Sequence, residues 1–254
     1  MFLANYGECF MMLADLHNHS CLSPCGSLEL SPRRLLEIGA AKGIKLIALT
    51  DHNSSLNCPA FAKLCPKYGV IPVYGMEAAT SEEIHVLCLF TSLQASMDFN
   101  EYAYSILTPF PNNPEKTGDQ VYVDEDDNIE GEVENYLISP LDISIDNIGA
   151  KIIEYGGIVI PAHVDRPAFS MTSQLGIVVD GPWTALECVR IPPAVNGLPL
   201  DTLNYPLITS SDAHFSEHVG RRPFTLNVSA EELQPDGNGT EANIDVLRKA
   251  LASL

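Results

Sequence analysis

Continuous apolar runs alternate with amphipathic segments along most of the chain. The runs predict β-strands at 11–17, 44–50, 70–77, 84–90, 157–163, 183–190, 205–214 and 223–228. Helical spacing of apolar positions predicts α-helices at 33–43, 59–69 (broken at Pro66), 92–107, 145–155 and 243–254. Strands that alternate with helices are typical of a parallel α/β fold, and this many units favour a TIM-like barrel over an open sheet.

One stretch, 109–135, interrupts the alternation. It begins as a loop and continues into QVYVDEDDNIEG, which predicts a small acidic hairpin with a polar turn at 126–128. A hairpin of this charge is either a solvated surface or a lid over a site. We treat it as an insertion, so that residues 1–254 form a single barrel domain, whose length is normal for this fold.

Five of the predicted strands end in a histidine or a carboxylate. The residues are His17 and His19, His52 beside Asp51, Glu77, His163, and Asp212 with His214. Because the carboxyl ends of parallel strands meet on one face of a barrel, we expect these side chains to gather at one mouth. His85 lies near the start of its strand, so its depth within the barrel is less defined. His218 lies outside the pattern, and we expect it at the surface or in contact with the metal ligands.

Metal binding is the simplest explanation for so many such residues. A single histidine beside a strand is usually structural, but each buried imidazole or carboxylate needs a partner to offset its desolvation. A shared centre of several metal ions supplies partners to all of them, and imidazole with carboxylate suits zinc, iron or manganese. Adjacent ions can activate a water molecule and hold both the attacking and the leaving oxygen of a phosphate ester.

Charge and composition narrow the expected partners. The chain has 33 acidic and 14 basic residues and a net charge of −19, so we expect no duplex nucleic acid, although a small phosphorylated substrate or a short oligonucleotide can still enter a metal site. We expect no membrane span, no signal peptide and a cytoplasmic location. The seven cysteines are odd in number and scattered, which does not suggest a disulfide framework.

A set of motifs in this chain resembles the PHP family, named for polymerase and histidinol phosphatase. The motifs are DLHNHS at 15–20, LTDHNS at 49–54, GME at 75–77 with IHVLCLF at 84–90, PAHVDRP at 161–167 and SSDAH at 210–214. HxH alone is a weak signal, but the ordered set is specific. The resemblance implies a distorted (β/α)7 barrel that hydrolyses phosphoesters with two or three divalent metal ions, which are zinc, manganese or iron.

The resemblance also implies how the ligands are shared. The groups are His17, His19, Glu77 and Asp212 for a first ion, Glu77, His85 and His163 for a second, and His52 with His214 for a third. If metal does not fully engage them, His52 or His214 could instead protonate the leaving oxygen.

The segment after HNH departs from the family pattern. Many relatives have an acidic residue or a histidine there that helps to hold the third ion, whereas this chain reads SCLSPCG, with Cys25 nearest the expected place. Cys25 is either a thiolate ligand, which would favour zinc or iron, or a neutral thiol beside a two-metal site. A redox pair of Cys21 and Cys25 is the weaker alternative because the spacing is not CxxC.

We expect a metal-dependent phosphoesterase that hydrolyses a small phosphorylated substrate with metal-activated water. Arg166 lies on the loop after the strand that ends in His163 and is the main candidate for binding the phosphate oxygens. Arg190, Arg221 and Arg222 are weaker candidates for the same role. Two alternatives stay open. One is a nucleotide or nucleic-acid-end phosphoesterase or exonuclease, and the other is a metal-binding regulatory module without turnover. The substrate and the oligomeric state are not determined.

Overall fold

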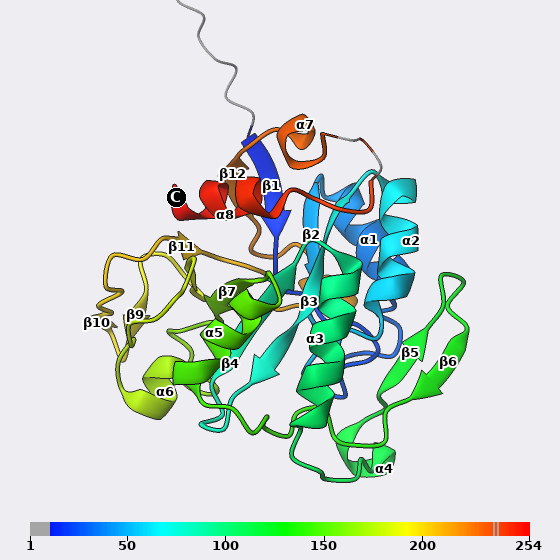
Figure 1. The fold of residues 1–254 in the computed structure, drawn as a ribbon, viewed down its shortest axis with the longest axis horizontal. Coiled ribbons are helices and arrows are strands. Elements are labelled where there is room, and N and C mark those ends of the chain that lie inside the picture. Colours follow the sequence, from blue (N-terminus) through cyan, green and yellow to red (C-terminus); the bar gives the residue numbers. More distant parts are fainter. Residues whose placement is uncertain (1–10, 236, 238) are drawn as a thin grey trace, which may run out of the picture.

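A six-stranded sheet forms the frame of the protein in the computed structural model, which describes residues 11–235, 237 and 239–254 (Figure 1). Residues 1–10, on which the expectation of no signal peptide rests, lie outside the described residues. In sheet order the strands are β12 (Phe224–Asn227), β1 (Met11–Asp15), β2 (Leu46–Leu49), β3 (Ile71–Ala79), β4 (His85–Phe90) and β7 (Ile158–Pro161). β8 (Leu186–Glu187) and β11 (Leu207–Ile208) form a separate parallel pair.

Four helices cover the outer face of this sheet. They are α1 (Pro32–Ala41), α2 (Cys58–Tyr68), α3 (Leu93–Ser105) and α5 (Ile145–Glu154). Each packs an apolar stripe on outward-facing strand residues, α1 and α2 on β2 and β3, and α3 and α5 on β3, β4 and β7. The start of α1 follows the expected pattern, because the Ser31 side chain accepts a hydrogen bond from the Arg34 N–H and Pro32 holds the first position.

The predicted break at Pro66 is wrong. α2 continues through Pro66 to Tyr68 and ends at Gly69, which has the left-handed φ of 62°. Pro66 removes one backbone hydrogen bond near the end of the helix, and packing of the buried Leu64 and Cys65 offsets that loss.

The inner face of the sheet encloses an apolar interior. Inward side chains from all six strands pack in one buried cluster with Ala185 and Ile208, which belong to the β8 and β11 segments. The C-terminal helix α8 (Ile244–Ala252) adds Leu247 and Leu251 to this cluster. The expected α/β class with a curled sheet is thus confirmed, while closure into a seven-unit barrel stays a prediction.

The direction of β4 differs from the all-parallel expectation. β4 pairs antiparallel with both β3 and β7, and Ala79 lies opposite His85 in the β3–β4 ladder. The connection spans only residues 80–84, which is too short for the crossover that a parallel pair requires. The start of β4 therefore lies at the edge where its neighbours end, and this reversal brings His85 to the mouth.

The predicted acidic hairpin is present as β5 (Val121–Val123) and β6 (Ile129–Glu132), and Figure 1 shows it projecting beyond α2. Ion pairs fasten its tip to α1 and α2. Arg33 lies 3.2 Å from both Asp126 and Asp127, and Lys63 lies 2.7 Å from Glu125. Further short elements that we did not predict are α4 (Pro114–Thr117), α6 (Met171–Leu175), β9 (Ala194–Val195), β10 (Leu198–Pro199), the 3-10 turn η1 (Ser216–His218) and α7 (Ala230–Leu233).

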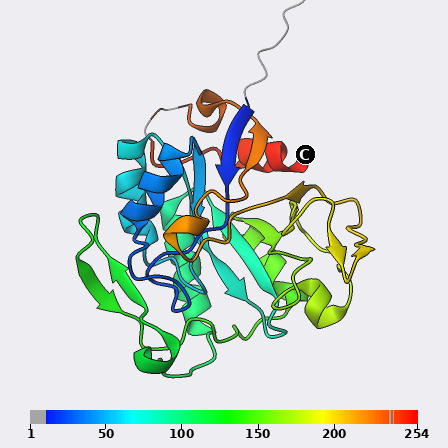
Figure 2. The same ribbon diagram turned by 180° about the vertical axis from the view of Figure 1, so that it is seen from behind.

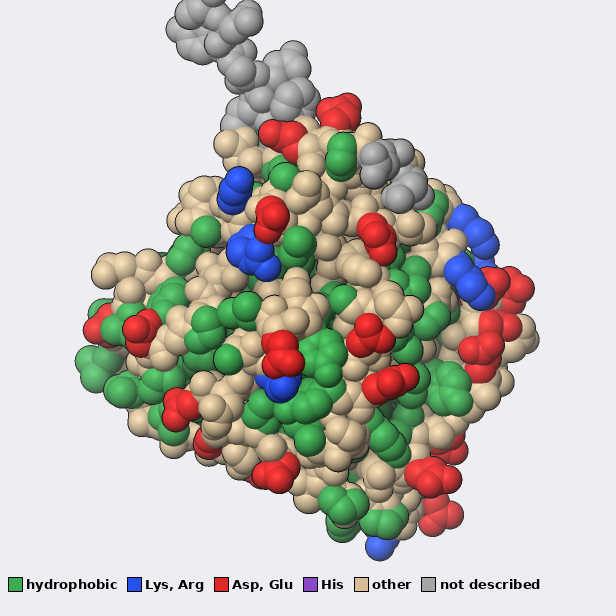
Figure 3. Space-filling model, viewed as in Figure 1, with side chains coloured by type: hydrophobic (Ala, Val, Ile, Leu, Met, Phe, Trp, Pro, Cys, Tyr) green, Lys and Arg blue, Asp and Glu red, His purple; other side chains and the backbone are tan. Residues whose placement is uncertain are grey.

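The surface is acidic but not uniform. The face seen in Figure 3 carries scattered acidic side chains and few basic ones, and no histidine is visible on it. Within the described ranges, no helix has both the length and the apolar character that a membrane crossing requires.

Packing of α8 against the sheet interior can be tested with a matched pair of substitutions. We expect Leu251→Ala to lower the free energy of unfolding by about 2–4 kcal/mol, because Leu251 is fully buried. Leu254→Ala is the control and should change it by less than about 0.5 kcal/mol, because Leu254 is exposed. Equal effects in urea unfolding would mean that α8 does not close the interior.

Candidate metal centre

The expected site residues gather where the loop after β1 meets the segment that follows β11. Figure 2 shows these two segments side by side at the lower end of the sheet. Backbone hydrogen bonds join them, from the His19 N–H to the Ala213 carbonyl (2.9 Å) and from the Ser27 N–H to the His214 carbonyl (2.8 Å). Segments almost 200 residues apart in sequence thus form one wall.

Glu77, at the end of β3, lies at the centre of this site. Its side chain is almost fully buried, and both carboxylate oxygens face histidines. From Oε1 the distances are 2.8 Å to His85 Nδ1, 2.9 Å to His163 Nε2 and 3.3 Å to His17 Nε2, and from Oε2 they are 3.0 Å to His52 Nδ1 and 3.4 Å to His19 Nε2. One carboxylate therefore faces five histidines from four different segments of the chain.

Asp212 forms the opposite side of the site. Its Oδ1 lies 3.4 Å from His214 Nδ1, 3.5 Å from His19 Nε2 and 3.6 Å from His17 Nε2. Its Oδ2 accepts a hydrogen bond from Arg166 (3.1 Å). The Asp212 carboxylate thus lies between the three histidines, which face Oδ1, and Arg166, which binds Oδ2.

The arrangement fits divalent metal ions in two independent respects. Bonds of about 2.0–2.2 Å from a metal ion to nitrogen or oxygen put neighbouring donor atoms about 3.0–3.5 Å apart. The donor pairs around Glu77 and Asp212 are 2.8–3.6 Å apart, which is close to that spacing. In the part of the chain that the structure describes, several buried polar atoms at this place lack a hydrogen-bond partner. They are Glu77 Oε2, Asp212 Oδ1, His52 Nδ1, His85 Nε2 and His163 Nδ1.

Three overlapping donor groups could each hold an ion. They are His17, His19 and Glu77; His52, Glu77 and His85; and His19, His52 and His214. Glu77 belongs to two of the groups, as expected. The groups differ from the expected sharing because His19 and His52 also belong to two groups each, and because Asp212 and His163 belong to none of the three.

Electrostatics acts in opposite directions on the candidate ligands. Against the effect of burial, Glu187, Glu77 and Asp212 raise the pKa of His17, and Asp212 and Glu77 raise the pKa of His19, so these two histidines must lose a proton when an ion binds. Burial alone would raise the pKa of Glu77, but His85, His17 and His52 hold it well below its usual range. Burial lowers the pKa of His85 to about 4, and burial with repulsion from His19 and His52 lowers that of His214 to about 2. The carboxylate is therefore ionised and these two imidazoles are neutral, as metal ligation requires.

Glu187, at the end of β8, is a site residue that the sequence analysis missed. Its Oε2 lies 2.9 Å from His17 Nδ1 and accepts a hydrogen bond from the His163 N–H (3.0 Å). The carboxylate thereby orients His17 with Nε2 toward Glu77 and Asp212. The available signal was a carboxylate inside the apolar run TALEC, which is costly to bury without a partner.

His19 is oriented in a similar way through Ser23 and Asp51. The Ser23 hydroxyl donates its proton to Asp51 Oδ1 (2.7 Å), so it can only accept from His19 Nδ1 (2.9 Å). In the neutral ring the proton of His19 therefore lies on Nδ1, which leaves the Nε2 lone pair for a cation. Asp51 also accepts from the Ser20 N–H and hydroxyl, both at 2.6 Å.

Two of the expected ligands have a backbone conformation that is rare outside glycine. His163 has a φ of 32° and Asp212 a φ of 47°. Asp15 anchors the second of them, because its carboxylate accepts hydrogen bonds from the N–H and the hydroxyl of Ser211 at 2.8 and 2.5 Å. Strain of this kind concentrates at functional sites, where the surrounding contacts hold it.

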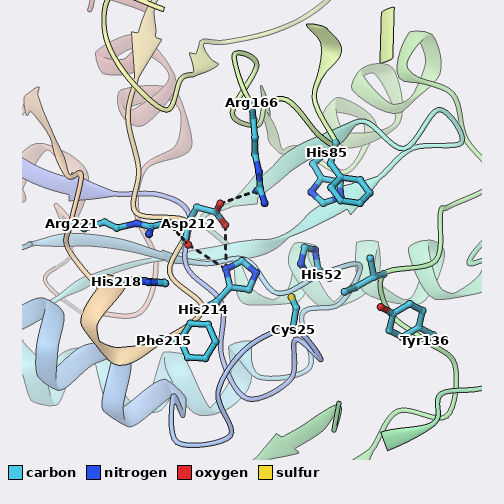
Figure 4. A pocket seen from close by; sticks show the side chains of 12 residues that line it. Cys25, His52, His85, Tyr136, Arg166, Asp212, His214, Phe215, His218 and Arg221 are labelled. Atoms are coloured by element: carbon cyan, nitrogen blue, oxygen red, sulfur yellow. Dashed lines mark hydrogen bonds and ion pairs between the residues drawn. The ribbon is translucent and has the colours of Figure 1, made fainter. Parts of the chain in front are cut away.

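The metal-ligand candidates open onto a cavity of about 490 Å3, which we call the histidine cavity (Figure 4). Its lining residues are Cys25, His52, His85, Tyr136, Ile138, Arg166, Phe169, Asp212, His214, Phe215, His218 and Arg221. His218, expected at the surface or in contact with the metal ligands, thus lies on the wall, against the Phe215 ring. The hairpin β5–β6 does not line the cavity, although Tyr136 and Ile138 just after it do.

Cys25 and Cys21 have different surroundings. Cys25 is exposed at the cavity and lies beside His52 in Figure 4. Cys21 is buried, receives a hydrogen bond from the Asn57 amide (3.6 Å), and has a pKa raised to about 12, mainly by burial. Both are free thiols.

Comparisons with known proteins agree with the expected family resemblance and with the fold. Residues 15–126 match the model of the PHP domain. An uncharacterized protein of Methanocaldococcus jannaschii is 38% identical over 80 residues, which make up 28% of this chain and 46% of that protein. The lesion-specific endonuclease Q of Pyrococcus furiosus has a TM-score of 0.60 at 19% identity, covering 96% of this chain and 56% of that chain.

A protein of Bifidobacterium adolescentis that is assigned as a metal-dependent phosphoesterase has a TM-score of 0.51 at 16% identity, covering 94% of this chain and 95% of that chain. At identities of 16–19% the structural matches establish the shared fold. The chain spans about half the length of the Methanocaldococcus protein and of endonuclease Q. The expected resemblance is confirmed for the matched residues.

The expectation that duplex nucleic acid is excluded is wrong. Endonuclease Q has also been solved with a 27-mer duplex substrate that carries an abasic lesion at the active site, and that structure matches with a TM-score of 0.62 at 19% identity, over 96% of this chain and 57% of that chain. The net charge cannot exclude duplex nucleic acid, because it is a sum over the whole chain, whereas nucleic-acid binding depends on the local electrostatic field. The same finding removes the reason for expecting only a small phosphorylated partner.

The orienting role of Glu187 gives a prediction for metal binding. We expect Glu187→Gln to weaken zinc affinity about 10-fold or more, because His17 loses the carboxylate that fixes its ring and raises its basicity. Competition with a chromophoric chelator measures the affinity, and circular dichroism monitors the fold. Glu154→Gln, at an exposed pair with Lys151, is the control. Equal affinities in both variants would contradict the role.

Proposed function

We propose that this protein, whose residues 15–126 match the model of the PHP domain, is a metal-dependent phosphoesterase with its centre built around Glu77. The observation that carries the proposal is the position of the Glu77 carboxylate, within 3.4 Å of donor nitrogens of five histidines in a buried site. A buried set of imidazole and carboxylate donors suits two or three divalent ions of zinc, manganese or iron.

The proposed roles follow from position. Divalent ions held by His17, His19, Cys25, His52, Glu77, His85, His163, Asp212 and His214 would activate water and neutralise charge on the phosphate. Arg166 is fixed by Asp212 Oδ2 at the cavity wall, so its remaining N–H groups can bind the non-reacting phosphate oxygens.

His52 and His214 have two possible duties in this proposal. In a three-ion centre both are ligands. In a two-ion centre they hold the proton for the leaving oxygen, and His52 is then the better donor. Burial opposes its charge, but Cys25 and Glu77 raise its pKa to about 9, whereas His214 is neutral.

We propose a nucleotide or the end of a nucleic-acid strand as the substrate. The histidine cavity has the volume of a small-ligand site. Phe169 and Phe215 are both partly exposed on its wall, and an exposed aromatic ring offers a stacking surface for a base. A metal-binding module without turnover is the competing possibility, which the assays below separate.

The fold assignment can also be carried one step further. We infer that β8 and β11 complete a distorted (β/α)7 barrel over residues 1–254, in which the seven barrel strands are β1, β2, β3, β4, β7, β8 and β11, β12 is an additional antiparallel strand beside β1, and the 109–135 segment is an insertion. The support is the shared apolar interior, to which Ala185 and Ile208 contribute together with the six-stranded sheet.

Turnover should depend on the proposed ligands. We expect His17→Ala and Asp212→Asn each to lower kcat/KM by at least about 100-fold with manganese, while the circular dichroism spectrum is unchanged. The assays are phosphate release from nucleoside monophosphates and shortening of end-labelled single strands and duplexes. Asp245→Asn, at an exposed ion pair, is the control. Retained activity in both site variants would refute the proposal, and metal binding without any hydrolysis would favour the module.

Cys25 should be visible as a ligand in the cobalt-substituted protein. We expect a near-ultraviolet thiolate-to-cobalt charge-transfer band that Cys25→Ser abolishes and Cys21→Ser retains, because only Cys25 lines the cavity beside His52. If stoichiometric cobalt gives no such band, Cys25 is a bystander thiol.

A further inference from the structure

A second cavity of about 430 Å3 adjoins the histidine cavity, and we call it the arginine cavity. Its lining residues are Asp165, Arg166, Pro167, Val189, Arg190, Asp212, Arg221 and Arg222. Four of the seven arginines of the chain thus surround one hollow, although acidic residues outnumber basic ones by 33 to 14. They come from the loops after β7, β8 and β11, which are far apart in sequence.

Backbone carbonyls hold three of these guanidinium groups. Arg190 donates to the Ala194 carbonyl (3.0 Å) and Arg222 to the Ser210 carbonyl (3.0 Å), while Arg221 donates to the carbonyls of Ser211 (2.5 Å) and Asp212 (3.0 Å). Within the described ranges, none of these three arginines forms an ion pair. Their charges are positioned but not neutralised by a direct partner.

Neither aspartate of the arginine cavity forms a direct ion pair with Arg190, Arg221 or Arg222 in the described part of the chain. Asp165 Oδ1 accepts a hydrogen bond from the Val189 N–H (2.6 Å). Asp212 directs Oδ2 to Arg166 and Oδ1 to the histidines. Crowding of like charges has a cost, since burial and the neighbouring Arg222 lower the pKa of Arg221. An anion in the cavity would remove that cost.

The two cavities share three wall residues, Arg166, Asp212 and Arg221. Figure 4 shows Arg221 on one side of Asp212 and the two histidines, His52 and His85, on the other side. In the same view Arg166 reaches the Asp212 carboxylate by a hydrogen bond. A phosphate at the metal centre and an anion in the arginine cavity would therefore be neighbours across Asp212.

We propose that the arginine cavity binds a second phosphate group of the substrate, adjacent to the phosphate that the metal centre hydrolyses. This inference rests on the proposed phosphoesterase function and narrows its substrate class to molecules with at least two phosphates. Guanidinium groups match phosphate oxygens bidentately, and several of them around one hollow form a site for a dianion or a backbone phosphate. A nucleoside bisphosphate and a phosphorylated strand end share this chemistry.

The alternative is that these arginines only brace the loop 210–212 through its carbonyls. Arg190 separates the two possibilities, because it bonds the Ala194 carbonyl and does not contact that loop in the bonds described. Arg248, an arginine on α8 that pairs with Asp245, provides the matched control.

The test uses the manganese-loaded full chain with adenosine 5′-monophosphate, adenosine 3′,5′-bisphosphate and a short 5′-phosphorylated single strand. We expect kcat/KM for the bisphosphate or the strand, divided by that for the monophosphate, to fall about tenfold or more in Arg190→Ala and to stay unchanged in Arg248→Ala. A loss with the bisphosphate points to small substrates, and a loss with the strand alone points to nucleic acid. An unchanged ratio with both probes overturns the inference.

A binding measurement keeps this test independent of turnover. Calorimetry on metal-free protein should show adenosine 3′,5′-bisphosphate binding at least about tenfold more tightly than the monophosphate, with the difference lost in Arg190→Ala. If no substrate is hydrolysed but this difference is present, the proposed function fails while the second phosphate site stands. Equal binding of both nucleotides would refute the site.

Discussion

Burial of the Glu77 carboxylate is the constraint on which the rest of the site depends. An ionised carboxylate in a closed interior is very costly unless opposite charges or strong hydrogen bonds surround it. Five histidines provide that environment, and they bring with them the segments that carry them. Glu77 Oε2 and Asp212 Oδ1 still lack hydrogen-bond partners, so the protein alone leaves the network incomplete. A cation is the group that completes it.

The supporting residues show that the donors are oriented as well as collected. Glu187 fixes one histidine of the HxH pair directly, and Asp51 fixes the other through Ser23. Both leave an Nε2 lone pair directed at the same carboxylates. Because orientation of this kind limits the loss of side-chain entropy on binding a metal ion, it raises affinity without adding a ligand.

Charge is distributed in a way that its total conceals. The net charge of −19 describes the far field of the molecule, which is repulsive to phosphate. Beside the metal centre, however, four arginines lie around one hollow, and three of them have no carboxylate partner among the described residues. A phosphate that bound at the proposed site would meet these guanidinium groups, whose local arrangement the net charge does not reveal.

The α/β class and most of the histidines and carboxylates that gather at the candidate site could be predicted from the sequence, because strand-end histidines in ordered motifs depend only on local pattern and on the rule that strand ends share a face. The position of His85 could not, since it follows from the antiparallel pairing of β4. Glu187, Asp51 and Asp15 were also missed as site residues, because their roles consist of contacts with residues distant in sequence, such as His17 and Ser211. The four arginines of the arginine cavity also come together only through contacts between segments that are distant in sequence. The sequence by itself determined which donor atoms are present, and only the tertiary structure decided which of them meet, because hydrogen bonds and coordination act over about 3 Å in space whatever the separation along the chain.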